Sequence, residues 1–279
     1  MSIYRCPLCS AKLFETDRSL KCEHGHSFDI SAEGYVHLLP PNKMNSKVPG
    51  DSKEMAASRS AFLDKGYYEP LLRELEKTVL ELAEGEEPSV LDCGCGEGYY
   101  TSGIAKELKN RISKAKIAGF DISRPSVRRA AKRTKEVEFA VASVFGIPVP
   151  DESFDILLNV FSPLSIGEYG RVLRDGGYYI YVVPAARHLW QLKAAIYDTP
   201  YENREADIPY EGFEHAETRR VRYETLIKTK EDIFALFQMT PYYWKTSAKG
   251  AEKLGKYESL LTEVAFDIHI YKKSTAKEK

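Results

Sequence analysis

The sequence predicts an α/β fold in which an open, doubly wound sheet follows a small N-terminal module. Three observations support this: short apolar runs alternate with helical segments, a glycine-rich turn follows the first run, and cysteines and a histidine are paired near the N-terminus. Such alternation is typical of buried parallel strands joined by helices. We expect strands over residues 89–92, 117–121, 138–141, 154–159 and 178–183, with helices such as 100–108 and 126–135 between them.

The first part of the chain is short, polar and without an apolar stretch that could form its own core. Cys6 and Cys9 are separated by two residues, and Cys22 and His26 by three. Two such pairs supply the four ligands of a closed, tetrahedral zinc site, and the bound metal can stabilise a module that has little core. His24 is the alternative fourth ligand. Its closer spacing to Cys22 is cramped, so we prefer His26.

A linker separates this module from the main domain. Pro40, Pro41, Pro49 and Gly50 flank a polar run, a composition typical of a linker or mobile loop. The predicted parts are a zinc-binding module at residues 1–36, the linker at 37–51, the main domain at 52–273 and a disordered Lys/Glu-rich tail at 274–279.

Helices and strands are also expected at both ends of the main domain. Helical spacing extends from residue 52 to 82 and is interrupted at Gly66 and Pro70, which predicts two helices. Near the C-terminus, β-rich patterning on either side of a helix predicts an antiparallel pair that closes the sheet. The two strands are expected near residues 219–228 and 264–272, and the helix near 230–237.

The composition is that of a soluble enzyme or binding protein. The chain of 279 residues is 43% hydrophobic and 29% charged, and its net charge of −1 gives no overall field that attracts nucleic acid. We find neither a signal peptide nor an 18-residue apolar stretch. Three cysteines near the N-terminus and two in the glycine-rich turn favour metal binding in a reducing compartment over disulfides. We therefore expect a cytoplasmic protein without membrane contact.

The glycine-rich turn follows the first strand of the main domain. Gly94, Gly96 and Gly98 form a G-x-G-x-G pattern, which differs from the G-x-G-x-x-G of dinucleotide-binding folds. Glycines let the backbone approach a ligand closely. Asp92, at the end of the strand, can accept hydrogen bonds from an ammonium group. The loop therefore suits S-adenosylmethionine (SAM), which carries an amino-acid group and a sulfonium, better than a pyrophosphate.

A second carboxylate lies at the end of the next strand. Asp121 can accept hydrogen bonds from both ribose hydroxyls, and open sheets bind ligands at the carboxyl ends of their strands. Ala142 and Ser143, beyond the third strand, either lie beside the adenine or form an ordinary loop. Cys93 and Cys95 are interpreted as small loop residues. Together these features predict a Rossmann-like, class I SAM-dependent methyltransferase domain behind a zinc-binding module.

With these motifs the sequence resembles the bacterial 23S rRNA guanine-N1 methyltransferases, the group that includes the tylosin-resistance methyltransferase. The resemblance extends over nearly the whole chain. The glycine loop is generic to SAM enzymes, whereas the zinc motif, Gly50-Asp51-Ser52 and Arg187-His188-Leu189 are more particular. Further matching segments are Glu33-Gly34-Tyr35-Val36, Gly66-Tyr67-Tyr68, residues 92–101 and Gln238-Met239-Thr240-Pro241.

The resemblance implies methylation of N1 of a guanine in 23S rRNA, and it suggests a homodimer. N1 lies on the pairing edge, so the target base must be unpaired or flipped, which fits a hairpin loop. Neutral N1 carries a proton, so a base or a group that stabilises the deprotonated ring is needed, and His188 is the candidate. The residues implied are Cys6, Cys9, Cys22 and His26 for zinc, and Tyr68, Gly96, Glu97 and His188 for SAM.

The residues that contact RNA are not evident. The segment 159–163 lacks the Asn/Asp-Pro-Pro-Tyr motif of amino-methylating enzymes, which argues against methylation of an exocyclic amine. Tyr242-Tyr243-Trp244 either stack on bases or pack in the core. The zinc-binding module is a candidate for RNA recognition by shape and hydrogen bonding. Two basic clusters either contact RNA or form solvated surfaces: Arg124, Arg128, Arg129, Lys132 and Arg133, and Arg219, Arg220 and Arg222.

Two other functions fit the same motifs. One is a SAM-dependent methyltransferase that acts on a small molecule such as a quinone-like metabolite, with the zinc-binding module as a structural lid. The other is a non-catalytic RNA-binding protein that retains SAM for stability. The first predicts activity without RNA, and the second predicts SAM binding without turnover.

Overall fold

In the computed structural model, which describes residues 1–41, 49–204 and 209–275, an eight-stranded sheet forms the centre of the molecule. Its strands are β4 (Tyr35–His37), β5 (Ser89–Cys93), β6 (Lys116–Asp121), β7 (Glu138–Val141), β8 (Phe154–Val160), β9 (Leu173–Pro184), β10 (Phe213–Ile227) and β11 (Leu260–Lys273). Their order is β10-β11-β9-β8-β5-β6-β7-β4. The strands from β9 to β4 run parallel, and β10 and β11 are antiparallel. The α/β fold is thus confirmed, including its closing antiparallel pair.

The sheet is buried on both faces. Every residue of β5 is buried, as expected for a central parallel strand covered on each side. Successive residues of a strand point to opposite faces. Accordingly, Val90 and Leu158 belong to one hydrophobic core, whereas Leu91 and Leu157 belong to a second core on the other face.

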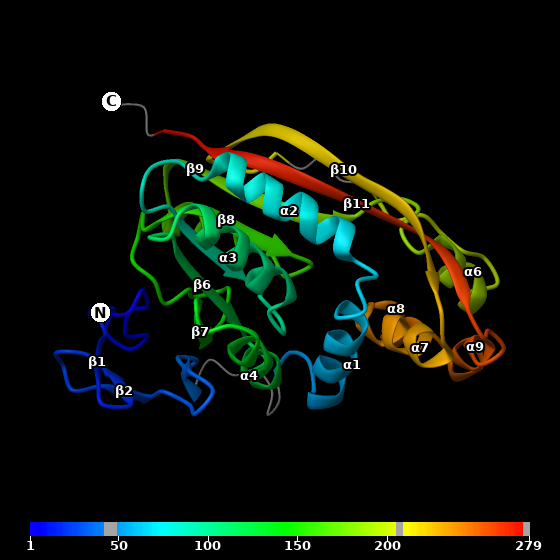
Figure 1. Cartoon of the computed structure of the whole chain (residues 1–279), viewed down its shortest axis with the longest axis horizontal. Coiled ribbons are helices and arrows are strands. Elements are labelled where there is room, and N and C mark those ends of the chain that lie inside the picture. The colour runs from blue at the N-terminus through cyan, green and yellow to red at the C-terminus, as the bar shows by residue number, and fades with distance from the viewer. Residues whose placement is uncertain (42–48, 205–208, 276–279) are drawn as a thin grey trace.

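The helices that contribute to the first core include α1 (Lys53–Leu63), α2 (Glu69–Leu82), α3 (Tyr99–Arg111) and α4 (Arg124–Arg133). α1 begins at Ser52, whose hydroxyl accepts a hydrogen bond from the backbone N–H of Met55. Gly66 has a φ of +79° between α1 and α2, and Pro70 lies in the first turn of α2. The predicted pair of helices and the positions of their interruption are therefore confirmed. α2 and α3 lie across the sheet in the view of Figure 1.

The N-terminal module covers part of the opposite face, together with α5 (Ile166–Val172). Tyr4 is buried there, and its hydroxyl lies 2.8 Å from the carbonyl oxygen of Gly119 and 3.0 Å from that of Glu138. The module thus packs directly on β6 and β7, and it lies beside β7 in Figure 1. It contains a small sheet of β1 (Phe14–Thr16), β2 (Ser19–Lys21) and β3 (Ser27–Asp29).

The last strand of the N-terminal segment belongs to the main sheet. β4 pairs in parallel with β7, with Val36 opposite Ala140, and the N–H of Leu38 donates to the carbonyl oxygen of Val141. The boundary expected after residue 36 therefore falls inside a strand. A three-residue edge strand is defined by its tertiary partner and gives no periodic signal of its own. Residues 42–48 of the expected linker and 276–279 of the expected tail lie outside the described residues.

The C-terminal region extends the sheet and covers one end of it. β10 and β11 run as two long strands along one side of the molecule in Figure 1, with further helices at one end of them. Those helices are α6 (Trp190–Ile196), α7 (Lys230–Met239), α8 (Tyr242–Lys245) and α9 (Ala248–Leu254). Across residues 1–41, 49–204 and 209–275, no helix combines the length and apolar character required to span a membrane.

Candidate active site and metal centre

A cavity of about 730 Å³ opens at the carboxyl ends of the parallel strands. Residues that follow β5, β6, β7, β8 and β9 line it, and residues of α1, α7 and α8 close it from the opposite side. This volume is in the range of sites that enclose a small organic ligand. The cavity brings together all seven residues predicted to bind SAM: Tyr68, Asp92, Gly94, Gly96, Glu97, Asp121 and His188.

The glycine loop forms the floor between β5 and α3. Gly94 has a φ of +88°, and a Cβ built on it would lie 2.4 Å from the side chain of Ser162. A side chain at this position would collide with the turn after β8. Gly96 has a φ of +55°, and no described atom lies within 4 Å of a Cβ built there. Its bare backbone therefore faces open space, where a ligand can approach closely.

Asp121 joins the end of β6 to this loop. One carboxylate oxygen accepts from the backbone N–H of Gly96 at 3.0 Å, and the other accepts from the N–H of Ser123 at 2.7 Å. Burial raises the pKa of Asp121, and these two N–H groups oppose that rise. Each carboxylate oxygen can accept more than one hydrogen bond, so both keep capacity for ribose hydroxyls.

Asp92 is buried at the end of β5. One carboxylate oxygen accepts from the hydroxyl of Thr101 at 2.6 Å, while the other has no hydrogen-bond partner within the described residues. Burial is the main reason that the pKa of this carboxyl is raised to about 7. Unpartnered buried oxygens are rare in folded proteins. This one fits the ammonium group of SAM, which would supply the missing donor.

Tyr68 and His188 form an aromatic wall of the cavity with Phe266. The ring centroid of Phe266 lies 5.1 Å from that of Tyr68 and 4.5 Å from that of His188. Nδ1 of His188 accepts from the backbone N–H of Ala265 at 3.2 Å, so the neutral ring carries its hydrogen on Nε2. Burial lowers the pKa of His188 to about 3. In this arrangement His188 is a hydrogen-bond donor, and its predicted catalytic role stays a prediction.

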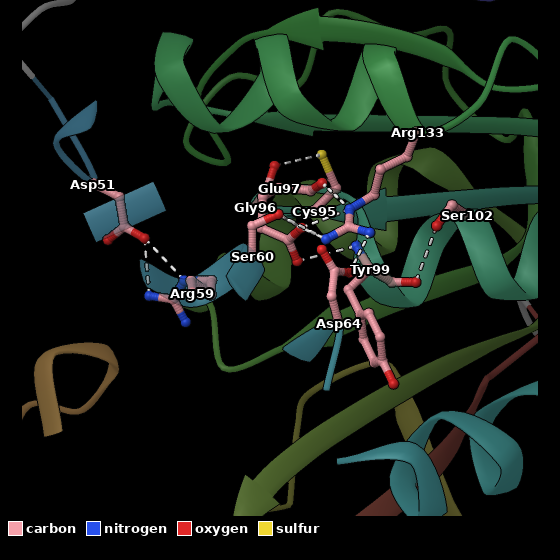
Figure 2. Close-up of polar contacts among 10 residues, drawn as sticks. All are labelled: Asp51, Arg59, Ser60, Asp64, Cys95, Gly96, Glu97, Tyr99, Ser102 and Arg133. Carbon is pink, nitrogen blue, oxygen red and sulfur yellow. Dashed lines mark hydrogen bonds and ion pairs between the residues drawn. The ribbon is translucent and has the colours of Figure 1, made fainter. Parts of the chain in front are cut away.

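Glu97 is held by groups of the protein itself. Its carboxylate accepts from Nε of Arg133 at 2.6 Å and from the hydroxyl of Ser60 at 3.3 Å. Figure 2 shows Arg133 reaching from α4 to Glu97, with Ser60 of α1 and Asp64, the residue after α1, beside it. Burial raises the pKa of Glu97, and Arg133 opposes this rise. The carboxylate thus fixes the glycine loop to two helices, and direct contact with SAM stays a prediction.

Several residues of the cavity were not singled out as site residues from the sequence. Asp51 and Arg59 form an ion pair at 2.9 Å, also visible in Figure 2. The hydroxyl of Ser123 donates to the backbone carbonyl of Asp51 at 2.7 Å, which places this pair next to Asp121. The acid of this ion pair belongs to the segment Gly50-Asp51-Ser52, which is one of the segments that carry the family resemblance. Three exposed aromatic residues also line the cavity: Phe145, Phe161 and Trp244. The sequence around Phe145 and Phe161 has no local pattern that predicts a site residue.

The predicted metal ligands meet in the N-terminal module. The ligand atoms of Cys6, Cys9, Cys22 and His26 all lie within 4.8 Å of one another, and the group does not include His24. The sulfurs of Cys9 and Cys22 are 3.8 Å apart. Two thiolates at tetrahedral positions on one zinc ion would be separated by about 3.8 Å, given Zn–S bonds of about 2.3 Å. The four residues therefore fit a structural zinc ion.

The basic clusters are largely engaged within the chain. On α4, Arg133 binds Glu97, and Arg128 forms an ion pair with Glu33 at 2.7 Å. Arg222 pairs with Asp267 at 2.5 Å. These arginines hold elements together, and Arg128 attaches α4 to the N-terminal module. In the aromatic run of residues 242–244, Tyr242 is buried, as expected for core packing, whereas Trp244 is exposed.

The comparisons with known proteins agree with this site. A zinc-ribbon family model described as "RlmA, N-terminal" matches residues 4–47, and one described as "Methyltransferase domain" matches residues 85–241. The 23S rRNA (guanine(748)-N(1))-methyltransferase of Streptomyces fradiae is 38% identical over 194 residues, covering 69% of this chain and 67% of that protein. YxjB of Bacillus subtilis strain 168, assigned to the 23S rRNA (guanine-N1)-methyltransferases, is 32% identical, covering 96% of each chain.

Similarity to enzymes that methylate small molecules covers a smaller part of the chain. The demethylmenaquinone methyltransferase of Thermotoga maritima is 34% identical over 100 residues, covering 36% of this chain and 42% of that protein. The methyltransferase domain uses SAM, and the zinc ribbon with its structural zinc ion precedes it in the chain. The chain therefore belongs to the family of 23S rRNA (guanine-N1)-methyltransferases.

Proposed function

We propose that this protein transfers the methyl group of SAM to N1 of a guanine in a hairpin loop of 23S rRNA. The observation that carries the proposal is the cavity at the carboxyl edge of the sheet, where the glycine loop, Asp92 and Asp121 converge. The chain that contains it matches rRNA methyltransferases over most of its length. The site supplies binding groups for the donor, and the similarity identifies the substrate.

Different residues of the cavity are expected to bind different parts of SAM. The backbone at Gly96 is open to a ligand, Asp121 offers acceptors to ribose hydroxyls, and Asp92 offers an unpartnered oxygen to the ammonium group. SAM, when bound, supplies an electrophilic methyl group. The contribution of the protein is to hold donor and base in line and to exclude water.

His188 is proposed to stabilise the reacting base. The N1–methyl bond forms as the methyl–sulfur bond of SAM breaks, which leaves S-adenosylhomocysteine, and the N1 proton is released to the solvent. Loss of this proton leaves negative charge that extends onto the carbonyl oxygen of guanine. Because Nδ1 of His188 accepts from Ala265, its Nε2–H is available to donate a hydrogen bond toward that charge. Because burial lowers the pKa of His188 to about 3, the ring stays neutral near pH 7 and is a poor proton acceptor. It can act instead as a neutral hydrogen-bond donor.

Recognition of the rRNA is proposed to involve the zinc-binding module. It packs on the sheet next to β7, whose following residues line the cavity, so it is held in a fixed position relative to the site. We further propose a cytoplasmic location, where reduced thiols remain available to zinc. The homodimer that the resemblance suggests is tested by light scattering of the zinc-loaded protein, which would give the mass of two chains.

The proposed function is tested by incubating the zinc-loaded protein with labelled SAM and an unmodified 23S rRNA transcript. A methyl group on N1 blocks base pairing, so reverse transcription should stop at one guanine that becomes labelled. Label transferred to a quinone extract but not to rRNA would support the small-molecule alternative. Bound SAM without transfer to either substrate would support the non-catalytic RNA-binding protein.

A further inference from the structure

The turn after β8 presents an aromatic ring in an unusual way. Phe161 has a φ of +59°, in the left-handed region that bulky residues rarely adopt. The residue is 43% exposed, and it lines the cavity. A strained backbone and an exposed apolar ring both cost stability, and neither contributes to the core. Strain of this kind is concentrated at functional sites, where it presets a side chain.

The surrounding structure fixes this turn. Asn159 is buried at the end of β8, and its side-chain oxygen accepts from the N–H of Ser162 at 3.1 Å. Its amide group donates to the carbonyl oxygen of Pro163 at 3.1 Å and to the hydroxyl of Tyr169 at 2.7 Å. The hydroxyl of Tyr169 in turn donates to the same carbonyl oxygen at 2.9 Å. These bonds hold the left-handed conformation of Phe161 before any ligand binds.

The turn also has a defined position relative to the methyl donor. Ser162 packs against Gly94, so Phe161 follows directly from a residue that contacts the glycine loop. In the sheet, β8 lies on one side of β5 and β6 on the other. Asp121, the proposed ribose acceptor, is the last residue of β6. Phe161 therefore lies on the opposite side of the glycine loop from the nucleoside, toward the methionine end of the donor.

One side of the Phe161 ring is supported from within the protein. Its centroid lies 5.3 Å from that of Phe266, with an angle of 42° between the rings, and Phe266 is fully buried. The remaining surface of the ring faces the cavity. A rigid aromatic ring, supported behind and open in front, is the arrangement on which proteins stack unpaired bases.

We propose that Phe161 is the stacking platform for the guanine that is methylated. This inference rests on the proposed function, because it takes an unpaired rRNA base as the substrate. The platform orients the plane of the base beside the methyl donor. Two further rings of the cavity, Phe145 at 69% and Trp244 at 71% exposure, extend the aromatic surface that an RNA loop would meet.

The test compares substitutions at Phe161 with one at Phe234. Phe234 is 42% exposed on α7, and it is not one of the described residues that line the cavity, so Phe234→Ala is a matched control. The substrate is an rRNA hairpin that carries the guanine mapped with the unaltered enzyme. Phe161→Tyr keeps a planar ring, Phe161→Leu keeps apolar bulk without one, and Phe161→Ala removes both. For each variant, kcat and KM for the hairpin and the Kd for SAM are measured.

Phe161→Ala and Phe161→Leu should lower kcat/KM for the hairpin by about 5- to 150-fold, the usual effect of losing one stacked base. Phe161→Tyr should restore most of the activity, Phe234→Ala should change nothing, and SAM affinity should stay within about twofold. The inference is overturned if Phe161→Leu is as active as Phe161→Tyr, or if SAM affinity falls in parallel with activity. Failure of the unaltered enzyme to methylate any guanine would instead contradict the proposed function.

Discussion

At the scale of single residues, the affinity for the methyl donor is expected to depend on the ionisation of the buried Asp92 carboxyl. Burial raises the pKa of its carboxyl to about 7, whereas the hydroxyl of Thr101 opposes that rise. A ligand ammonium group binds the ionised form, so protonation competes with binding as the pH falls. We expect the affinity for S-adenosylhomocysteine, which keeps the ammonium group, to increase by about tenfold from pH 6 to pH 8. Calorimetric titrations across this range measure it.

Two variants serve as controls for this pH dependence. Asp92→Asn should bind weakly with little change over the same range, because the amide does not titrate. Thr101→Val removes a hydrogen bond to the carboxylate. It should therefore raise the pKa of Asp92 further and move the transition to higher pH. An affinity of the unaltered protein that is constant from pH 6 to pH 8 contradicts this role of Asp92.

His188 gives a second expectation at this scale. Its lowered pKa and its bond to Ala265 imply a ring that stays neutral throughout the physiological range. His188→Asn offers both an acceptor and an N–H donor, so it should keep more activity than His188→Ala, by about tenfold. The pH profile of kcat between pH 5.5 and 8.5 should have the same shape for His188→Asn as for the unaltered enzyme. Loss of a titration near pH 6.5 in the variant would instead identify His188 as a proton acceptor.

At the scale of elements, the pair of Arg133 and Glu97 attaches α4 to the glycine loop, and Ser60 and Asp64 extend the contact to α1. Arg133→Met leaves a buried carboxylate without its cation, which we expect to lower the free energy of unfolding at pH 7 by about 3 kcal/mol. Glu97→Gln should cost less, since Arg133 keeps Asp64 as a partner. Urea denaturation of both variants measures the difference.

The loss in Arg133→Met should also depend on pH. Without the cation, the pKa of Glu97 rises further above its value in the unfolded chain. The folded state then binds more protons, so its stability falls as the pH increases, and the loss should be larger at pH 8 than at pH 5. Equal losses at both pH values, or equal costs for Arg133→Met and Glu97→Gln, would show that the ion pair is not what holds these elements.

The elements that could be predicted are those with a local signal. The parallel strands β5 to β9 each contain an apolar run, and Gly66 lies between α1 and α2 while Pro70 lies in the first turn of α2, so their patterns are visible in the chain. β4 was not predicted, because three residues become a strand only through pairing with β7. Likewise Arg133 and Glu97, which are 36 positions apart, give no sign in sequence that they form a buried pair.

The residues of the candidate site also divide into those with a local sequence pattern and those without one. The glycine loop and Asp121 could be identified because strand ends, glycine spacing and acidic residues form a local pattern, and the cavity brings them together. The orientation of Phe161 depends on a single φ angle and on hydrogen bonds from Asn159. The tautomer of His188 depends on a backbone N–H of β11, a distant strand. The contacts around Phe161 are local but give no periodic pattern, and the partner of His188 is 77 positions away in the chain.

At the scale of the whole molecule, the zinc-binding module and the main sheet form one packed unit. Zinc should therefore stabilise more than residues 1–36, because Tyr4 and β4 connect the module to β6 and β7. After chelation we expect hydrogen exchange to accelerate in the module and in β4, while β5 and β8 stay protected. His26→Ala should lose zinc, and His24→Ala, outside the ligand group, should retain it. Zinc retained by His26→Ala but lost by His24→Ala would reverse the ligand assignment.

Binding of one molecule of SAM by the glycine loop and Asp121 is the property on which the proposed function depends, and equilibrium dialysis of labelled SAM against the zinc-loaded protein measures it. We expect saturation at one SAM per chain. Asp121→Ala should weaken the affinity by at least about tenfold, as for loss of charged hydrogen bonds. Asp151→Ala, which alters a carboxylate exposed on the surface, should leave it unchanged. Absence of saturable binding, or equal affinities of the two variants, would show that the glycine loop and Asp121 do not form the SAM site.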